Sequence, residues 1–337
     1  MTKKEYVLQA VSHKETDKVP YCIRLTGEGY EAYGERLLKD FYNKEVQEDL
    51  KEGKISFIQA VDLSIGNFMI DVGAPWWDWD YDNMPAVYAD GEEEPDVMPP
   101  VIRRDSEENI QAYFDRAKYI AEKYETFNTA LIWGSHWEKA YFTRGIENFL
   151  ADLAAFPEFS QELLTFIINL NMEVLPKIAA CPHVDGILLG SDWGTQNDLI
   201  MSPVTWREMI KPGEKREYEL LRSYDKKVMV HSCGQILRVM PDLVELGVDI
   251  LNPVQPECMD LKFLKETYGD NITFWGGIST QRTLPQGTPD DVRRETREVI
   301  ELMSRNGGYI TCSSQEIQTD VPYENLKALI ETAKSYT

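Results

Sequence analysis

The chain has 337 residues, 43% of them hydrophobic, and a formal net charge of −22 from 57 acidic and 35 basic residues. This length suits one large α/β domain, so we expect a single domain over residues 1–337. The negative charge argues against nucleic acid and against anionic membranes as partners. No run approaches the ~20 apolar residues of a membrane span, and the N-terminus lacks an apolar signal segment. Five scattered cysteines fit a reducing compartment, so we expect a cytoplasmic protein.

Short apolar or β-branched runs recur along the chain at fairly regular spacing. Eight of them predict strands, at 20–24, 65–71, 129–135, 184–190, 227–231, 248–252, 272–275 and 308–311. Amphipathic helical patterns lie between most of the runs, notably at 105–124, 159–178 and 290–304. Eight alternations of strand and helix predict parallel strands with crossover helices, which can close into a single (β/α)8 TIM barrel.

Residues 74–104 interrupt this rhythm. The segment contains Trp76, Trp77, Trp79, Tyr81 and several prolines. We interpret it as a long aromatic-rich insertion after the second strand, because this density of aromatic residues argues against disorder. It is a candidate lid or docking element.

The fifth strand end carries the pair on which the functional prediction depends. In parallel barrels the chemistry lies at the carboxyl ends of the strands, and residues two apart on a strand point to the same face. His231 and Cys233 can therefore both face the barrel mouth, as two zinc ligands. The alternative is a hydrogen-bonded core histidine beside a small buried cysteine. Cys312, after the eighth strand, is a candidate third ligand or else a structural cysteine.

Two carboxylates are further candidates at the mouth. Asp192 follows the fourth strand and precedes a glycine turn, so it can contact substrate or metal, or merely form an Asx turn. Thr143 can cap a helix, which would place Glu147 in its first turn near the mouth. The alternative for Glu147 is stabilisation of the helix dipole.

The remaining strand ends suggest the walls of a substrate pocket. Gln255 follows the sixth strand, and Trp275 precedes two glycines that let a ligand approach the backbone. Trp193, Trp275 and Tyr309 would supply flat apolar walls, although aromatic residues at such positions are also common in cores.

Several of these motifs, in this order, resemble the uroporphyrinogen decarboxylase superfamily. The matching segments are 191–196, 231–234, 249–256, 275–281 and 307–325, and the resemblance extends from about Thr143 onward. It implies the barrel expected above. The decarboxylases of this superfamily grip their substrate's carboxylates with Arg-x-x-x-Arg. Here Arg24 is present, but Glu28 stands at the second arginine position, where it would repel a polyanion. Porphyrinogen decarboxylation is therefore disfavoured.

The corrinoid-dependent methyltransferase branch of the superfamily is more similar. Its thiol-methylating members hold zinc with His-x-Cys and a later cysteine, whose position falls near Gln315 rather than Cys312. Its ether-cleaving members of O-demethylase systems have a Glu-x14-Glu-x20-His zinc pattern, which Glu147, Glu162 and His183 satisfy.

The resemblance implies a methyltransferase that moves a methyl group from an aryl methyl ether or methylated amine to the cobalt of a corrinoid protein. Zinc at His231 and Cys233 would assist, while Glu147 or Asp192 would complete the metal shell or donate a proton. Transfer from methyl-corrinoid to tetrahydrofolate or a thiol, and a non-catalytic binding protein, remain alternatives. A homodimer is the candidate assembly.

Overall fold

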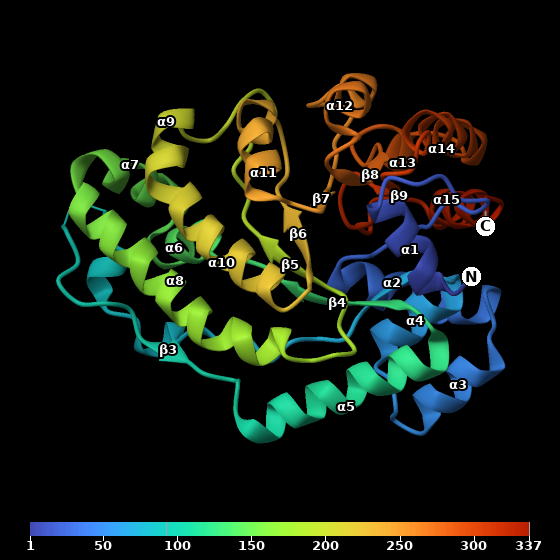
Figure 1. Ribbon diagram of the computed structural model, residues 1–337, viewed down its shortest axis with the longest axis horizontal. Helices are drawn as coiled ribbons and strands as arrows, with labels where there is room; N and C mark the ends of the chain where they lie inside the picture. Colours follow the sequence, from blue (N-terminus) through green and yellow to red (C-terminus); the bar gives the residue numbers. More distant parts are fainter. Residues whose placement is uncertain (92, 337) are drawn as a thin grey trace.

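The computed structural model describes residues 1–91 and 93–336 (Figure 1). Glu92 and Thr337, which belong to the predicted domain 1–337, lie outside the described residues. The helices are α1 (Lys3–Val11), α2 (Gly27–Asp40), α3 (Lys44–Lys51), α4 (Phe57–Ile65), α5 (Glu107–Tyr124), α6 (Trp137–Arg144), α7 (Ile146–Ala155), α8 (Pro157–Ala179), α9 (Pro203–Thr205), α10 (Lys211–Ser223), α11 (Met240–Leu246), α12 (Leu261–Tyr268), α13 (Thr283–Gln286), α14 (Pro289–Met303) and α15 (Tyr323–Lys334).

A parallel sheet forms the centre of the molecule, with helices around it (Figure 1). Within the described residues it has seven strands, in the order β1 (Met69–Asp71), β4 (Phe127–Ile132), β5 (Gly186–Gly190), β6 (Lys227–His231), β7 (Ile250–Asn252), β8 (Thr273–Ile278) and β9 (Tyr309–Ser313). Each strand in this order pairs in parallel with the next one. This confirms the predicted parallel α/β architecture, which resembles a TIM barrel.

The first predicted strand, 20–24, is not a regular strand. It makes only isolated parallel bridges, Tyr21 to Thr311 and Leu25 to Ile317. These bridges are four residues apart in one segment and six apart in the other, so a continuous ladder cannot form between them. The prediction of eight regular strands is therefore wrong by this one element.

The same segment nevertheless joins the two edges of the sheet. The carbonyl of Tyr21 accepts a hydrogen bond from Phe68 N beside β1. The side-chain amide of Asn67 then stands in for a strand partner. Its Oδ1 accepts from Ile23 N at 2.9 Å, and its Nδ2 donates to the Ile23 carbonyl at 2.8 Å. The segment thus lies between β9 and β1 and brings Arg24 to the same end of the sheet as the other strand ends.

Most of the other predicted elements lie where the sequence places them. β6 has the predicted bounds, and α14 lies within one residue of the predicted 290–304, with a capping box formed by Thr288 and Asp291 at its start. The second predicted strand, 65–71, starts too early. Ile65 ends α4, and Gly66 caps that helix in a left-handed conformation, so β1 begins only at Met69.

The segment between β1 and α5 contains a small antiparallel pair, β2 (Asp78–Trp79) with β3 (Val101–Ile102). Its tryptophans are buried and do not form an exposed docking surface. Trp79 Nε1 donates to the Lys139 carbonyl at 2.8 Å, and Trp77 Nε1 donates to Asn171 Oδ1 at 2.7 Å. The segment is therefore fastened to α6 and α8 by its aromatic side chains.

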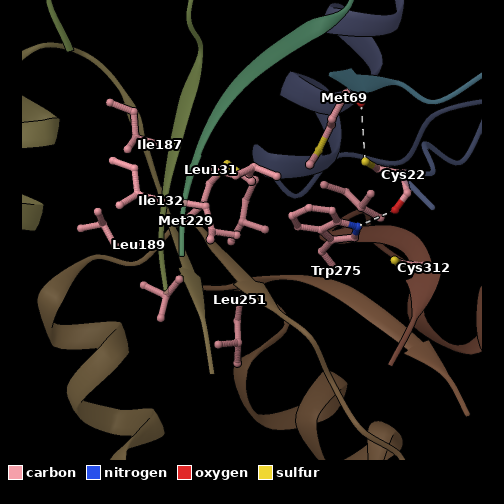
Figure 2. Packing of buried hydrophobic residues seen from close by; sticks show 14 of the residues in the cluster. Cys22, Met69, Leu131, Ile132, Ile187, Leu189, Met229, Leu251, Trp275 and Cys312 are labelled. Carbon is pink, nitrogen blue, oxygen red and sulfur yellow. Dashed lines mark hydrogen bonds between the residues drawn. The ribbon is translucent and has the colours of Figure 1, made fainter. Parts of the chain in front are cut away.

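The interior of the sheet is filled with apolar side chains such as Met69, Leu131 and Met229, with Trp275 and Cys312 nearby (Figure 2). None of the helices in the described ranges combines the length and the apolar character that a membrane crossing requires.

Candidate active site

The His231–Cys233 pair lies at the carboxyl end of β6. The register aligns Gly190 of β5, His231 of β6 and Asn252 of β7, so the loops after these three strands begin side by side. His231 Nε2 lies 3.4 Å from Cys233 Sγ. The imidazole is almost completely buried, whereas Cys233 is partly accessible. Both side chains therefore meet at the strand ends, where a ligand can reach the thiol.

Asn252 determines which nitrogen of His231 carries the proton. Its Nδ2 donates to the Trp275 carbonyl at 3.0 Å, so its Oδ1 is the atom that faces His231 Nδ1 at 2.7 Å. An amide oxygen only accepts, so Nδ1 must donate and the lone pair of neutral histidine lies on Nε2. That lone pair points towards Cys233. This is the tautomer and the outer hydrogen bond that a histidine ligand of zinc requires.

Asp192 completes a group of three ligand-type side chains. Its Oδ1 accepts a hydrogen bond from Cys233 N at 2.7 Å and lies 3.6 Å from His231 Nε2. One ligand atom from each of Asp192, His231 and Cys233 lies within 4.8 Å of the other two. A single metal ion can span such separations after small side-chain adjustments.

The charges around Cys233 also suit a cation. Burial, the charge of Asp192 and the charge of Glu138 raise the pKa of the Cys233 thiol well above its usual range, while the Gln315 amide opposes this. A thiolate would thus be unfavourable beside two carboxylates. A bound divalent ion reverses this balance because it attracts the Cys233 thiolate and the Asp192 carboxylate. The residues present therefore fit a zinc ion.

Gln315 occupies the position at which the resemblance places a further cysteine ligand. Its Nε2 donates to Cys233 Sγ at 3.0 Å, and its Oε1 accepts from Glu316 N at 2.9 Å. The amide is therefore held with its donor towards the sulfur.

Glu138 belongs to the site, although we did not predict it. It lies in the first turn of α6, and its Oε1 accepts from Tyr141 at 3.2 Å. Its carboxylate lies against Gly190, at the end of β5. Burial, followed by the charge of Asp192, raises the pKa of Glu138 to about 7. In the sequence it resembles an ordinary helix-dipole residue, so only its spatial position reveals it.

The loops after β5 and β6 touch through two glycines. A Cβ on Gly234, whose φ is +81°, would lie 2.5 Å from the Thr195 carbonyl oxygen, so Gly234 is required for this approach. A Cβ on Gly194 would collide with the carbonyl of Cys233. The contact fixes Asp192 next to Cys233.

The predicted ligands Cys312 and Glu147 lie apart from this group. Cys312 is buried near Cys22 and Trp275 (Figure 2) and contacts Ser313. Glu147 does lie in the first turn of α7, but the cap is Gly145, not Thr143, whose hydroxyl bonds the Ala140 carbonyl. The Glu147 side chain is exposed.

The Glu-x14-Glu-x20-His pattern is not assembled either. Among the described residues, Glu147, Glu162 and His183 do not form a group with ligand atoms within 4.8 Å of one another. Glu162 is exposed on α8, and His183 precedes β5, at the amino end of the strand.

The three aromatic residues predicted to line the pocket are core residues. Trp193, Trp275 and Tyr309 are all at most 2% exposed. Trp275 Nε1 donates to the Cys22 carbonyl and Tyr309 to the Gly276 carbonyl, so their polar groups face the protein. The aromatic side chain at the mouth is instead Trp133, which is 41% exposed and packs edge-on against His231, with ring centroids 4.8 Å apart.

A polar cavity of about 180 Å³ adjoins the cluster. Gln255 and Gln315 line it together with Thr280, Gln281 and Glu316. Gln255 Oε1 also accepts from Gly234 N, so this predicted substrate contact both lines the cavity and holds the β6 loop.

Comparison with known proteins shows the family of the chain. The chain belongs to the uroporphyrinogen decarboxylase (URO-D) family, which it matches over residues 2–336. It is 25% identical over 148 residues to a methylated-thiol–coenzyme M methyltransferase of Methanosarcina mazei, and 26% identical over 137 residues to a methylcobamide:CoM methyltransferase of Methanosarcina barkeri. These stretches cover 44% and 41% of this chain, but only 37% and 38% of the two relatives.

The fold has a counterpart among solved structures. A methyltransferase from Methanosarcina mazei superposes with a TM-score of 0.68 at 18% identity, covering 100% of this chain and 99% of that one. At this identity the likeness shows the fold alone.

Proposed function

We propose that this protein is a corrinoid-dependent methyltransferase in which Asp192, His231 and Cys233 hold a zinc ion at the end of β6. The observation that carries the proposal is the orientation of His231. Asn252 holds Nδ1 at 2.7 Å, which leaves Nε2 free to face Cys233 and Asp192. Two methyltransferase relatives of the chain support the reaction class.

Zinc would supply Lewis acidity to the oxygen, nitrogen or sulfur atom that exchanges the methyl group. The residues around it position that atom. Trp133 provides an apolar edge beside His231, and the amides of Gln255 and Gln315 provide polar contacts in the adjoining cavity. The cavity of about 180 Å³ suits a small substrate.

We propose transfer from an aryl methyl ether or methylated amine to the cobalt of a corrinoid protein. The cobalt of the reduced corrinoid protein would supply the electron pair of the new cobalt–carbon bond. The bond between the methyl carbon and the donor atom breaks, and its electron pair stays on the donor atom. That atom then takes a proton from Glu138, which lies beside the cluster without being one of its ligands. A general acid is valuable here because alkoxide, phenolate and amide anions are poor leaving groups.

The corrinoid protein must cover the mouth of the site for its cobalt to reach the methyl group. Three exposed apolar side chains, Trp133, Phe142 and Ile146, lie on the segment that follows β4. This segment contains both Trp133 and Glu138, so it is our candidate for the contact surface. We prefer it to the 74–104 segment, whose tryptophans are buried although Tyr81 is exposed, because it carries Trp133 and Glu138 of the site.

A second candidate is transfer from a methyl-corrinoid to a thiol. The two Methanosarcina relatives favour it, since both are coenzyme M methyltransferases. Gln315 at the position of the further cysteine argues for the first candidate. An assay that supplies either methyl donors with reduced corrinoid, or methyl-corrinoid with thiols, separates the two.

Zinc analysis of the purified protein tests the metal assignment. We expect His231→Ala and Cys233→Ala to lose one zinc equivalent per chain relative to wild type. Cys258→Ala serves as the control, because Cys258 is also partly accessible but lies outside the group of three. Unchanged zinc content in both variants would overturn the assignment.

A further inference from the structure

A second group of ligand-type side chains is buried where α10 packs against α8 and the start of α6. It consists of His136, Glu214 and Glu217, whose ligand atoms lie within 4.8 Å of one another. The three side chains are at most 1% exposed. His136 immediately precedes α6, and the two glutamates are one turn apart on α10.

The polar atoms of this group are only half satisfied. His136 Nδ1 lies 3.1 Å from Glu214 Oε1, and Glu217 Oε1 accepts from Asn171 Nδ2 at 2.7 Å. By hydrogen-bond geometry, the second oxygen of each carboxylate and His136 Nε2 have no partner among the described residues. The buried Tyr218 hydroxyl also lies near Glu214, and burial together with the charge of Glu214 raises the pKa of Tyr218. Within residues 1–91 and 93–336, no lysine or arginine forms an ion pair with either glutamate. No lysine or arginine thus neutralises these two acids through a direct ion pair; Arg216 acts on Glu217 only from a greater distance, and His136 offsets one charge only when it is protonated.

Burying two carboxylates together is costly unless their charge is neutralised. The desolvation penalty is several kcal/mol for each buried ion. Burial and the charge of Glu214 raise the pKa of Glu217 well above its usual range. Either protons or a metal ion must therefore occupy the group. Protons would neutralise the charge and let the carboxyl groups hydrogen-bond each other, whereas a metal ion would give both carboxylates and the imidazole one common partner.

We propose that His136, Glu214 and Glu217 bind a divalent metal ion at a site separate from the β6 cluster. One imidazole and two carboxylates suit Zn²⁺, Mn²⁺ or Fe²⁺. Two carboxylates balance the charge of one divalent ion, so the site becomes neutral when it is filled. This inference does not rest on the proposed methyl transfer.

The surrounding backbone leaves room for the histidine and for water. A Cβ on Gly213 would lie 2.5 Å from His136 Cε1, so only glycine fits there without displacing the ring. His136 also lines a cavity of about 80 Å³ between α8 and α10, large enough for an ordered water. A π-helical turn at Trp206–Ile210 leads into α10, and such turns occur frequently at functional sites.

A metal ion here would stabilise the loop that carries the active-site residues. Asn171 Nδ2 donates both to Glu217 and to the Ser135 carbonyl, and Asn171 Oδ1 accepts from Trp77. Glu217, Ser135 and Trp77 are therefore linked through one amide. His136 lies two residues before Glu138 in the chain. The metal ion would therefore have a structural role and hold the start of α6 in place.

The test compares zinc binding by four full-length proteins, wild type, Glu217→Gln, Glu214→Gln and Glu219→Gln. Glu219 is the matched control, because it lies on the same helix but is exposed. Each protein is treated with a chelator, reloaded with Zn²⁺, desalted and analysed for zinc, and its melting temperature is measured in both states.

We expect Glu217→Gln and Glu214→Gln each to bind one zinc equivalent fewer than wild type and Glu219→Gln. Zinc should also raise the melting temperature of the control more than that of the two variants. Equal zinc content in all four proteins would overturn the proposal. A second outcome would also overturn it. If the metal-free variants melted above metal-free wild type, and zinc raised their melting temperature as much as that of wild type, the two glutamates would be a proton-sharing pair and not metal ligands. Loss of the β6 cluster's zinc in Cys233→Ala alters none of these differences, so the two proposals can fail separately.

Discussion

Gln315 donates a hydrogen bond from Nε2 to the sulfur of Cys233 over 3.0 Å. The thiol-methylating proteins that the sequence resembles have a zinc-binding cysteine near this position. Here an amide contacts the sulfur instead, and Asp192 supplies the third ligand-type group. The site is therefore a histidine–cysteine–aspartate group rather than one with two cysteines.

Replacing Gln315 by cysteine should strengthen zinc binding. A second thiolate beside Cys233 would complete the ligand set, and we expect at least a roughly tenfold lower Kd for zinc, measured by chelator competition. Gln318→Cys is the control, because this glutamine lies on the same loop but is exposed. An equal change in both variants would contradict the placement of residue 315.

The orientation of His231 gives a second prediction. Asn252→Ala removes the acceptor of the Nδ1 proton, so the imidazole loses its preferred tautomer, and zinc affinity should fall about 10–100-fold. Asn252→Asp keeps an acceptor at that position and should retain most of the affinity. The chelator competition assay measures both, and equal affinities in the two variants would show that Asn252 does not position the histidine.

Glu138 and Glu147 offer a direct comparison of two candidate acids. Glu138→Gln removes the acid beside the cluster and should slow methyl transfer by about 10²–10³-fold at unchanged zinc content at the β6 cluster. Glu147→Gln alters an exposed side chain on α7 and should leave the rate unchanged. If Glu147→Gln were slower than Glu138→Gln, Glu147, the acid predicted from the sequence, would be the proton donor.

Asp105 should make stability depend on pH. Its carboxylate accepts from Arg103 Nε and Nη2 at 2.8 and 2.9 Å and from Lys177 at 2.6 Å. The Arg103 hydrogen bonds, with that of Lys177, hold the pKa of Asp105 well below its usual range. Since the folded-state pKa is depressed, this stability is present above about pH 4 and is lost as the pH falls through the unfolded and then the folded pKa.

Asp105→Asn should therefore lower the free energy of unfolding in urea by about 2 kcal/mol at pH 7, with a smaller difference at pH 3. Glu173→Gln removes only the exposed partner of Arg103 and should change the free energy of unfolding by less than about 0.5 kcal/mol. A difference between Asp105→Asn and wild type that is the same at both pH values would contradict this assignment.

Local patterns in the sequence predict the strand ends well but not the groups that converge from distant segments. The run 227–231 and the spacing of His231 and Cys233 place this pair at the end of a strand, because strand periodicity is a local property. Glu138 could not be distinguished from a helix-dipole residue. The His136–Glu214–Glu217 group joins residues 78 apart and depends on the packing of α10, which no periodicity reveals.

The three aromatic residues that the sequence predicts in the pocket walls are buried in the structure for a related reason. Trp193, Trp275 and Tyr309 follow or belong to strands, where a side chain can face either the mouth or the core. Trp275 and Tyr309 donate hydrogen bonds to backbone carbonyls of the protein, and Trp193 is completely buried, so all three face the core. Sequence alone gives their position along the strand but not the depth of the pocket.

The rate of corrinoid methylation by Cys233→Ala shows whether methyl transfer depends on a zinc ion held at the end of β6. Methylation of reduced corrinoid is followed by absorbance, with a panel of aryl methyl ethers and methylated amines as donors, for wild type, Cys233→Ala and Cys258→Ala. We expect Cys233→Ala to be slower than wild type by at least about 10²-fold, because Lewis acidity at the site contributes several kcal/mol, and Cys258→Ala to keep the wild-type rate. A wild-type rate in Cys233→Ala would contradict zinc-assisted methyl transfer at this site.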